Sequence, residues 1–128
     1  MNEHAIQNAI RNALAGRCLL FRANTGTAWT GNKVDRLPGG RVLIHDARPF
    51  STGLPPGFAD TFGLVPLVIT ADMVGQTIGQ FLAGEIKTPT GRLSDKQEAF
   101  LRAIKNNGGR AAVWRSPADA LATVLGAL

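Results

Sequence analysis

The residues of this sequence whose types and spacing best suit catalysis are two carboxylates and a lysine. Glu85 and Lys87 occur in the run FLAGEIK, where one residue separates them, so both lie on the same face of a β-strand. An apolar strand that carries both charges on one face loses solvation energy unless they are paired or used. Asp60 occurs in GFADTFG, at the start of an earlier β-rich run. If the two runs form an antiparallel hairpin through a turn at residues 71–77, all three side chains converge at one end of it.

Two converging carboxylates would make an oxygen-rich site that suits Mg²⁺ or Mn²⁺. Such an ion polarises a phosphoryl oxygen and activates a water molecule, and a nearby lysine orients that water or helps to deprotonate it. These are the requirements of phosphodiester hydrolysis. From the spacing alone, a half-exposed cross-strand charge pair without a catalytic role is the simpler interpretation.

Two polar residues on the apolar faces of predicted helices favour a catalytic site over a charge pair without a catalytic role. Glu3 lies on the apolar face of a helix predicted over residues 3–15, and Gln97 on that of a helix predicted over residues 94–107. Each also has a local explanation, because an acid in the first turn favours the helix dipole and Ser94 with Gln97 forms a capping-box pattern. The apolar residues concerned are Ile6 and Ile10 in the first helix, and Phe100, Leu101 and Ile104 in the second.

Apolar periodicity and turn residues also predict the other elements that position these residues. A third helix opens at Ser116 and Pro117. Strands or β-rich runs are predicted over residues 18–21, 41–48, 58–70, 78–87 and 111–114. Residues 23–40 are predicted to form a loop or an irregular hairpin, and residues 49–57 a loop. The sequence contains no repeat or linker, so we expect a single domain over residues 1–128 of the α/β or α+β class.

The composition points to a polyanionic partner. Among the 128 residues, 14 Lys and Arg face 9 Asp and Glu, which gives a net charge of +5. Nucleic acid is the commonest partner of so basic a domain, and a basic protein without such a role is the alternative. One cysteine, Cys18, excludes a disulfide framework and a multi-cysteine zinc site. No apolar run approaches the roughly 20 residues of a membrane helix, and we expect a cytoplasmic protein.

Taken in order, these motifs resemble the VRR-NUC domain, the virus-type replication-repair nuclease branch of the PD-(D/E)xK superfamily. The resemblance rests on FRANTG, GFADTFG, GEIKTPTGRLSDKQ and NNGGRAAVWRSPADAL, and it extends from Glu3 to Leu121. One departure is Thr61-Phe62, where the family pattern usually has two aliphatic residues. The elements predicted from the residues follow the order α-β-β-β-α-β-α. The resemblance implies that they form a restriction-endonuclease-like α/β fold, with a central mixed β-sheet flanked by helices.

The resemblance also implies a role for each matching residue. The implied metal ligands, for Mg²⁺ or Mn²⁺, are Glu3, Asp60, Glu85 and the backbone carbonyl of Ile86. Lys87 is implied as the catalytic lysine, and Gln97 as a residue that supports the site.

The expected function is therefore metal-dependent cleavage of DNA. The resemblance to stand-alone family members implies a homodimer that cuts branched DNA such as four-way junctions. A monomeric flap or nicking nuclease, a non-catalytic DNA-binding module and a structural protein remain alternatives. The cations expected to contact DNA are Lys33, Arg36, Arg41, Arg92 and Lys96.

Three further residue groups have two interpretations each. Trp29 either stacks on a base or fills the core, and the core is favoured. Arg115 either contacts DNA or pairs with Asp119. The apolar side chains of the last helix either form a dimer surface or cover the sheet; they are Leu121, Val124 and Leu125.

Overall fold

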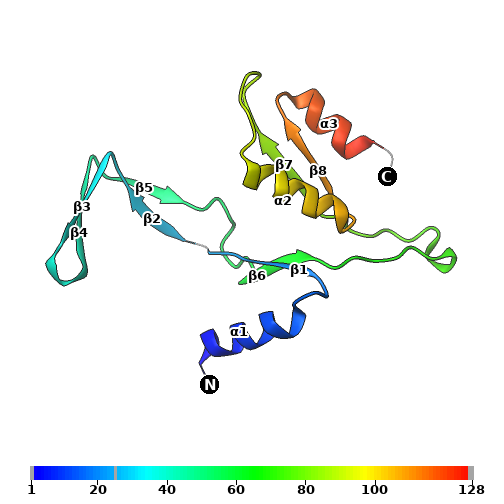
Figure 1. Ribbon diagram of the computed structural model, residues 1–128, viewed down its shortest axis with the longest axis horizontal. Helices are drawn as coiled ribbons and strands as arrows, with labels where there is room; N and C mark the ends of the chain where they lie inside the picture. The colour runs from blue at the N-terminus through cyan, green and yellow to red at the C-terminus, as the bar shows by residue number, and fades with distance from the viewer. Residues whose placement is uncertain (1, 25, 127–128) are drawn as a thin grey trace. The chain divides into compact units, whose positions relative to one another are not determined.

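The computed structural model describes residues 2–24 and 26–126 and divides the chain into two compact units (Figure 1). The larger unit comprises residues 1–20 and 63–128, and the smaller unit residues 21–62. The single domain expected over residues 1–128 stays a prediction. The described residues combine helices with short strands, which confirms the mixed α/β class.

Three helices begin at the residues that their capping patterns predict. They are α1 (Glu3–Leu14), α2 (Asp95–Asn106) and α3 (Pro117–Leu125). The Asn2 side chain accepts from the Ala5 amide at 2.9 Å, and the Ser116 hydroxyl from the Asp119 amide at 3.2 Å. These bonds satisfy backbone donors that the first turn of a helix leaves without partners.

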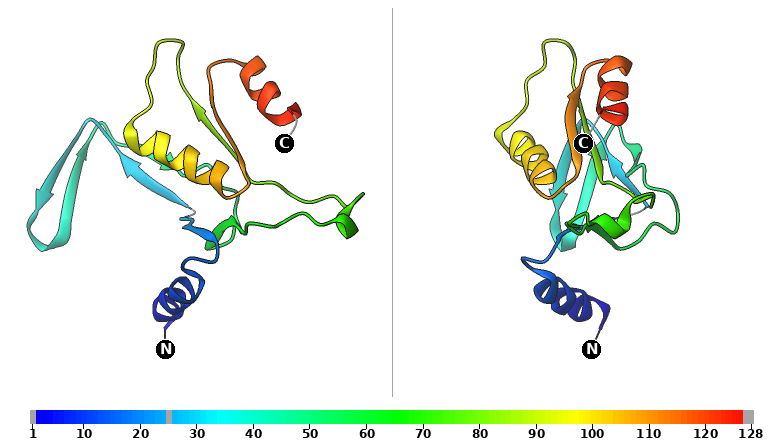
Figure 2. Two further views of the ribbon diagram at one scale, coloured as in Figure 1. Left: turned by 45° about the vertical axis from the view of Figure 1, so that its right-hand side comes forward. Right: turned by 90° about the vertical axis from the view of Figure 1, so that its right-hand side faces the viewer.

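The larger unit is built around two parallel strands, β7 (Leu82–Ile86) and β8 (Arg110–Trp114), which α2 connects. Figure 2 shows α2 and α3 on opposite sides of this pair. Leu101 and Ile104 of α2 and Ala111 of β8 form the core, with Ile104 fully buried. The apolar stripe predicted for α2 therefore faces the sheet, although Phe100 remains 43% exposed.

Helix α3 is held against the other face of β8 by polar contacts. The Trp114 indole N–H donates to the Thr123 hydroxyl at 3.1 Å. The Arg110 guanidinium donates to carbonyls at the end of α3, including that of Thr123 at 2.9 Å. A cation at this position compensates both the unsatisfied carbonyls and the negative end of the helix dipole.

Gly84 is required by the Trp114 ring. A Cβ atom at Gly84 would lie 2.1 Å from atoms of that ring. We expect Gly84→Ala to lower the free energy of unfolding by about 1–3 kcal/mol, because the ring would have to leave its position. Gly79→Ala is the matched control, since a Cβ there has no heavy atom within 4 Å. Urea denaturation of both variants measures the difference, and equal stabilities would contradict the packing described.

The smaller unit consists largely of two antiparallel strand pairs. Strand β2 (Thr27–Thr30) pairs with β5 (Arg48–Ser51), and β3 (Lys33–Leu37) with β4 (Arg41–His45) through a 3₁₀ turn, Pro38–Gly40. Of the two predictions for residues 23–40, a loop or an irregular hairpin, the loop is therefore wrong for the residues that form β2 and β3. Thr25, within that range, lies outside the described residues. The predicted strand 41–48 is two strands, and the predicted loop 49–57 contains most of β5. Gly-rich composition obscured strands whose pairing partners lie further along the chain.

The predicted hairpin between residues 58–70 and 78–87 is wrong. Strand β6 (Thr61–Leu64) pairs with β1 (Leu19–Arg22), whereas β7 pairs with β8. Pro66 explains why β6 is short, because proline has no N–H to donate to a ladder. The described residues form four two-stranded sheets in place of the expected central sheet, and the order α-β-β-β-α-β-α is replaced by one with more strands.

A 3₁₀ turn, Ala71–Met73, interrupts the irregular chain between β6 and β7, as predicted for residues 71–77. The Thr70 hydroxyl donates to the Asp72 carboxylate, and this hydrogen bond lowers the pKa of Asp72.

Several predicted core residues are exposed. In α1 none of the described residues is buried, and Ile6 and Ile10 are close to half exposed, so the predicted core face of this helix is wrong. Trp29 is 63% exposed, which contradicts its favoured place in the core. Leu121, Val124 and Leu125 of α3 are exposed, which does not fit the interpretation that they cover the sheet, and a dimer surface on this helix stays a prediction. Thr123 of the same helix contacts Trp114 of β8. No helix in the described ranges has the length and apolar character needed to cross a membrane.

Candidate active site

Glu85 and Lys87 lie at the C-terminal end of β7, on the face that α2 covers. Half-buried and exposed residues alternate along this strand, with Glu85 and Lys87 on the half-buried side and Ile86 on the exposed side. The Lys87 ammonium lies 3.7 Å from Glu85 Oε1, and the two side chains are 22% and 32% exposed. The predicted shared face of the carboxylate and the ammonium is confirmed.

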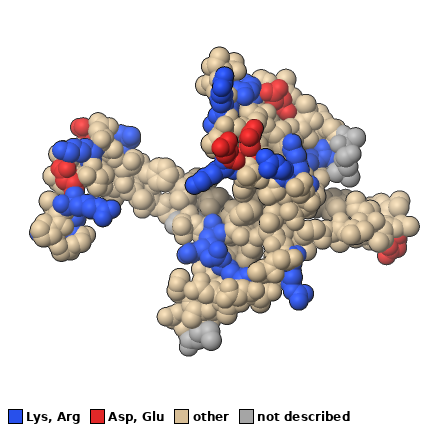
Figure 3. Space-filling view, viewed as in Figure 1, with Lys and Arg blue, Asp and Glu red and all other residues tan. Residues whose placement is uncertain are grey.

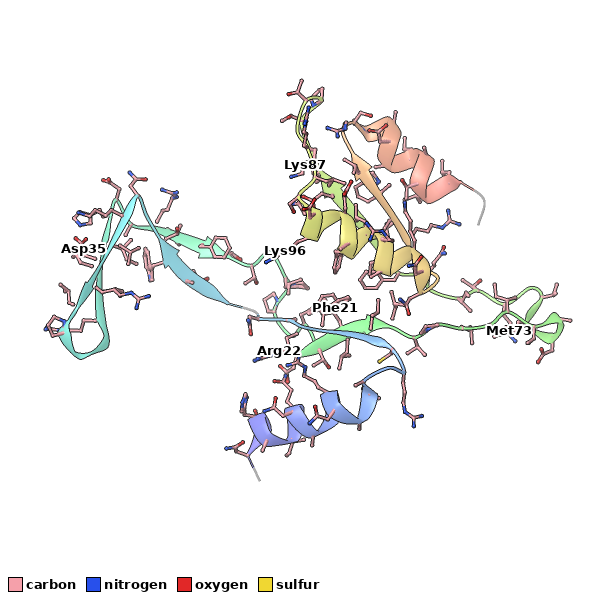
Figure 4. All side chains as sticks on the ribbon, viewed as in Figure 1. Phe21, Arg22, Asp35, Met73, Lys87 and Lys96 are labelled. Atoms are coloured by element: carbon pink, nitrogen blue, oxygen red, sulfur yellow. The ribbon has the colours of Figure 1, made fainter. Side chains whose placement is uncertain are left out.

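Gln97 connects this pair to the start of α2. Its Nε2 donates to Glu85 Oε1 at 2.8 Å, and its Oε1 accepts from the Ser94 amide at 2.9 Å. The Ser94 hydroxyl in turn accepts from the Gln97 amide at 3.1 Å. The predicted capping box is therefore confirmed, and the same side chain also contacts Glu85; its role in supporting the site stays a prediction. The bond from Gln97 to Glu85 thus connects the start of α2 to the end of β7. In Figure 4, the label Lys87 marks the end of β7 and the label Lys96 marks the start of α2.

Two oxygen atoms at the Glu85–Lys87 pair have lone pairs available to bind a cation: Oε2 of Glu85 and the backbone carbonyl oxygen of Ile86. Lys87 and Gln97 both contact Oε1 of Glu85, and no side chain in the described part of the chain donates to Oε2. The Lys87 amide donates to the Trp114 carbonyl at 3.1 Å. Successive residues of a strand point their backbone groups to opposite edges, so the Ile86 carbonyl points away from β8. A carboxylate oxygen and a carbonyl oxygen are ligands that fit Mg²⁺ or Mn²⁺.

Asp60 belongs to the smaller unit, where it is exposed and directly precedes β6. The Ala23 amide donates to its backbone carbonyl at 2.9 Å. Phe62 packs against Phe21 and Phe58, with ring centroids 5.6 and 5.5 Å apart. This aromatic cluster gives Phe62, one of the two residues that depart from the family pattern, a packing role two positions from Asp60. The hairpin that was to bring Asp60 to Glu85 does not exist, so their convergence stays a prediction.

Two glycines flank Asp60 for separate reasons. Gly57 has φ +81°, in the left-handed region that favours glycine. Gly63 passes close to the neighbouring strand, where a Cβ would lie 1.9 Å from the Leu19 carbonyl oxygen. The backbone geometry therefore requires glycine at both ends of the GFADTFG motif.

Glu3 lies in the exposed first turn of α1, beside the capping residue Asn2. This position fits the helix-dipole interpretation, and its role as a metal ligand stays a prediction. Within the described residues of either unit, no group of three or more His, Cys, Asp or Glu side chains is placed to hold a metal ion.

All five cations predicted to contact DNA are exposed. Lys33 pairs with Asp35 at 3.5 Å, and Asp35 also contacts His45 at 2.7 Å. The Arg41 guanidinium donates to the Pro38 carbonyl at 3.0 Å. Figure 3 shows Lys and Arg side chains on the β3–β4 hairpin and, separately, around α2. Their contact with DNA stays a prediction.

Arg115 has a role that neither interpretation anticipated. Its backbone amide, not its guanidinium, contacts Asp119, with the donor 2.8 Å from Oδ2. The guanidinium donates to the carbonyls of Thr88 and Gly91, in the turn that follows Lys87. The sequence held no signal for this contact, because the partners are backbone atoms far away along the chain.

Comparison with known proteins matches the chain to one family model. The family model described as the VRR-NUC domain matches residues 45–118, which is more than half of the chain and includes Asp60, Glu85, Lys87 and Gln97. No curated protein and no solved structure matches. The chain has the features of a nuclease-type, DNA-processing protein, and it belongs to the VRR-NUC family. The resemblance stated from the sequence motifs is thereby confirmed over residues 45–118, and its extension to Glu3 and FRANTG stays a prediction.

The two contacts of Gln97 can be separated by substitution. Gln97→Ala removes the bond to Glu85 and half of the capping box. If Glu85 holds a catalytic cation, we expect a roughly 10–100-fold loss of DNA cleavage, because the substitution removes a residue that orients its ligand. Ser94→Ala is the matched control, because it weakens the cap by about 0.5–2 kcal/mol while leaving the Gln97 amide opposite Glu85. Urea denaturation and cleavage rates are measured together. Equal losses of cleavage in the two variants would mean that Gln97 acts only through the helix.

Proposed function

We propose that this protein is a Mg²⁺- or Mn²⁺-dependent endonuclease that hydrolyses DNA phosphodiester bonds. The observation that carries the proposal is the chain of contacts from Gln97 to Glu85 to Lys87. It joins a helix N-terminus, a carboxylate and an ammonium at the end of one strand. The Gln97 amide holds the Glu85 carboxylate in one orientation, which supports the proposal because a metal ligand must be oriented by its neighbours.

The proposed site assigns a task to each of its residues. Glu85, the Ile86 carbonyl and Asp60 would hold the divalent cation, with Glu3 as a further ligand. The cation supplies Lewis acidity to the phosphodiester. Gln97 keeps the Glu85 carboxylate in one orientation, and Lys87 orients the attacking water or moves its proton.

The proposed substrate is branched DNA, and the proposed active form is a homodimer. Two sites related by a two-fold axis can cut two strands, which the resolution of a four-way junction requires. The exposed cations Lys33, Arg36, Arg41, Arg92 and Lys96 are proposed to contact phosphates. Each such contact releases counterions, so binding should weaken steeply as salt increases.

The test compares cleavage of a four-way junction, a flap and a linear duplex with Mg²⁺ or Mn²⁺, alongside the sedimentation mass of the protein. The proposal predicts junction-selective cutting by a dimer. Selective cutting of the flap, or nicking by a monomer, would retain the nuclease and replace the substrate. Binding of the junction without any cutting would support a non-catalytic DNA-binding module and contradict the proposal.

A further inference from the structure

The turn that follows Lys87 is closed by two sets of hydrogen bonds. The Gly91 amide donates to the Thr88 carbonyl at 3.1 Å, and Pro89 occupies the second position, where proline favours a tight turn. The Arg115 guanidinium donates to the same Thr88 carbonyl and, at 2.8 Å, to the Gly91 carbonyl. One arginine therefore ties together the first and last residues of the turn.

The end of β8 holds the backbone on both sides of Lys87. The Trp114 carbonyl accepts from the Lys87 amide at 3.1 Å, and Arg115, the next residue, reaches the carbonyl of Thr88. The turn also folds back on the lysine, since a Cβ at Gly91 would lie 3.5 Å from the Lys87 Cβ. The Lys87 side chain is 22% exposed, and its Nζ lies 3.7 Å from Glu85 Oε1.

Arg115 is itself fixed at its backbone. Its amide donates to Asp119 Oδ2 at 2.8 Å, and the Asp119 amide donates to the Ser116 hydroxyl at 3.2 Å, at the start of α3. The guanidinium thus extends from a rigid junction between a strand and a helix. Both bonds leave one nitrogen, Nη1, whose two N–H groups are fixed in the plane of the guanidinium. A lysine ammonium lies one bond closer to its backbone and its N–H groups rotate freely, so it does not hold the two carbonyls in the same geometry.

From these contacts we infer that Arg115 is a positioning residue for Lys87, one that fixes the Lys87–Gly91 turn so that the ammonium stays beside the Glu85 carboxylate. The inference rests on the proposed nuclease function, in which Lys87 acts on the attacking water. According to this inference, Arg115 positions residues of the site and does not bind phosphate, although it is exposed.

The test uses Arg115→Lys and Arg115→Ala, with Arg102→Lys in the exposed face of α2 as the control. For the DNA that the unaltered protein cuts, we expect both Arg115 variants to lower the single-turnover rate constant roughly 10–100-fold, as for residues that orient catalytic groups. The dissociation constant for DNA, measured without divalent cations, and its salt dependence should not change. The Gly91 amide should exchange its hydrogen faster in both variants, whereas Arg102→Lys should match the unaltered protein.

Two results would overturn the inference alone. One is full activity of Arg115→Lys, since charge would then suffice. The other is a loss confined to DNA affinity in Arg115→Ala, with the salt slope lower by about one, as expected for a lost phosphate contact. If Arg115→Ala does not fold, Arg115→Lys decides. If the unaltered protein cuts no DNA, the proposed function fails, and the inference fails with it. If the unaltered protein cuts DNA and Arg115→Lys cuts it equally well, only the inference fails.

Discussion

Glu85→Gln is expected to lower DNA cleavage in the presence of Mg²⁺ or Mn²⁺ roughly 10³-fold while leaving the protein folded. Glutamine has the shape of glutamate and can still meet the Gln97 amide, so the contact between β7 and α2 persists. The substitution removes the negative charge that holds the proposed cation and faces Lys87. Loss of several kcal/mol of transition-state stabilisation corresponds to a cleavage rate roughly 10³-fold lower.

Metal binding provides a second measurement on the same variant. Mn²⁺ titration by calorimetry should give a clear heat of binding with the unaltered protein and a much weaker one with Glu85→Gln. Glu98→Gln, an exposed acid in the first turn of α2, is the matched control and should behave as the unaltered protein. Normal Mn²⁺ affinity in Glu85→Gln would remove this carboxylate from the proposed ligand set.

Asp60→Asn is expected to have an effect of similar size, although Asp60 belongs to the other compact unit. If Asp60 supplies the second carboxylate, its amide variant loses a negatively charged ligand, and cleavage should again fall roughly 10³-fold. Stability should change little, because the structural contact of Asp60 is made by its backbone carbonyl, which accepts from Ala23.

Asp46→Asn is the control for Asp60→Asn, because both lie in the smaller unit. Asp46 has φ 51°, a conformation that asparagine also tolerates. Cleavage by Asp46→Asn should match that of the unaltered protein. Full activity of Asp60→Asn would mean that the site consists of Glu85, Lys87 and Gln97 without a carboxylate from residues 21–62.

Local chemistry made much of this structure predictable. Asn2, Ser94 and Ser116 begin helices because a capping bond depends on residues only three positions apart. Glu85 and Lys87 share a face because the alternation of a strand needs no knowledge of its partner. Gln97 was found by its polar side chain on an apolar stripe, which is also a local pattern.

The errors come from contacts between distant segments. A hairpin of residues 58–70 with 78–87 is the simplest connection between two neighbouring β-rich runs, yet β6 pairs with β1 and β7 with β8. Burial of Leu101 and Ile104 of α2 and of Ala111 of β8 favours the β7–α2–β8 unit over that hairpin. The role of Arg115 depends on backbone carbonyls of another segment, and no residue type marks such a contact in a sequence.

The most direct test of the central claim compares DNA cleavage by the unaltered protein and by Lys87→Ala in the presence of Mg²⁺ or Mn²⁺. Lys105→Ala, in the exposed last turn of α2, controls for the loss of one positive charge. If the Glu85–Lys87–Gln97 cluster is the active site, Lys87→Ala should bind DNA normally and cut roughly 10²–10⁴-fold more slowly, the range for loss of a residue that transfers protons. Lys105→Ala should cut at the normal rate. Cleavage by Lys87→Ala at the rate of the unaltered protein would contradict the account and place the chemistry elsewhere in the chain.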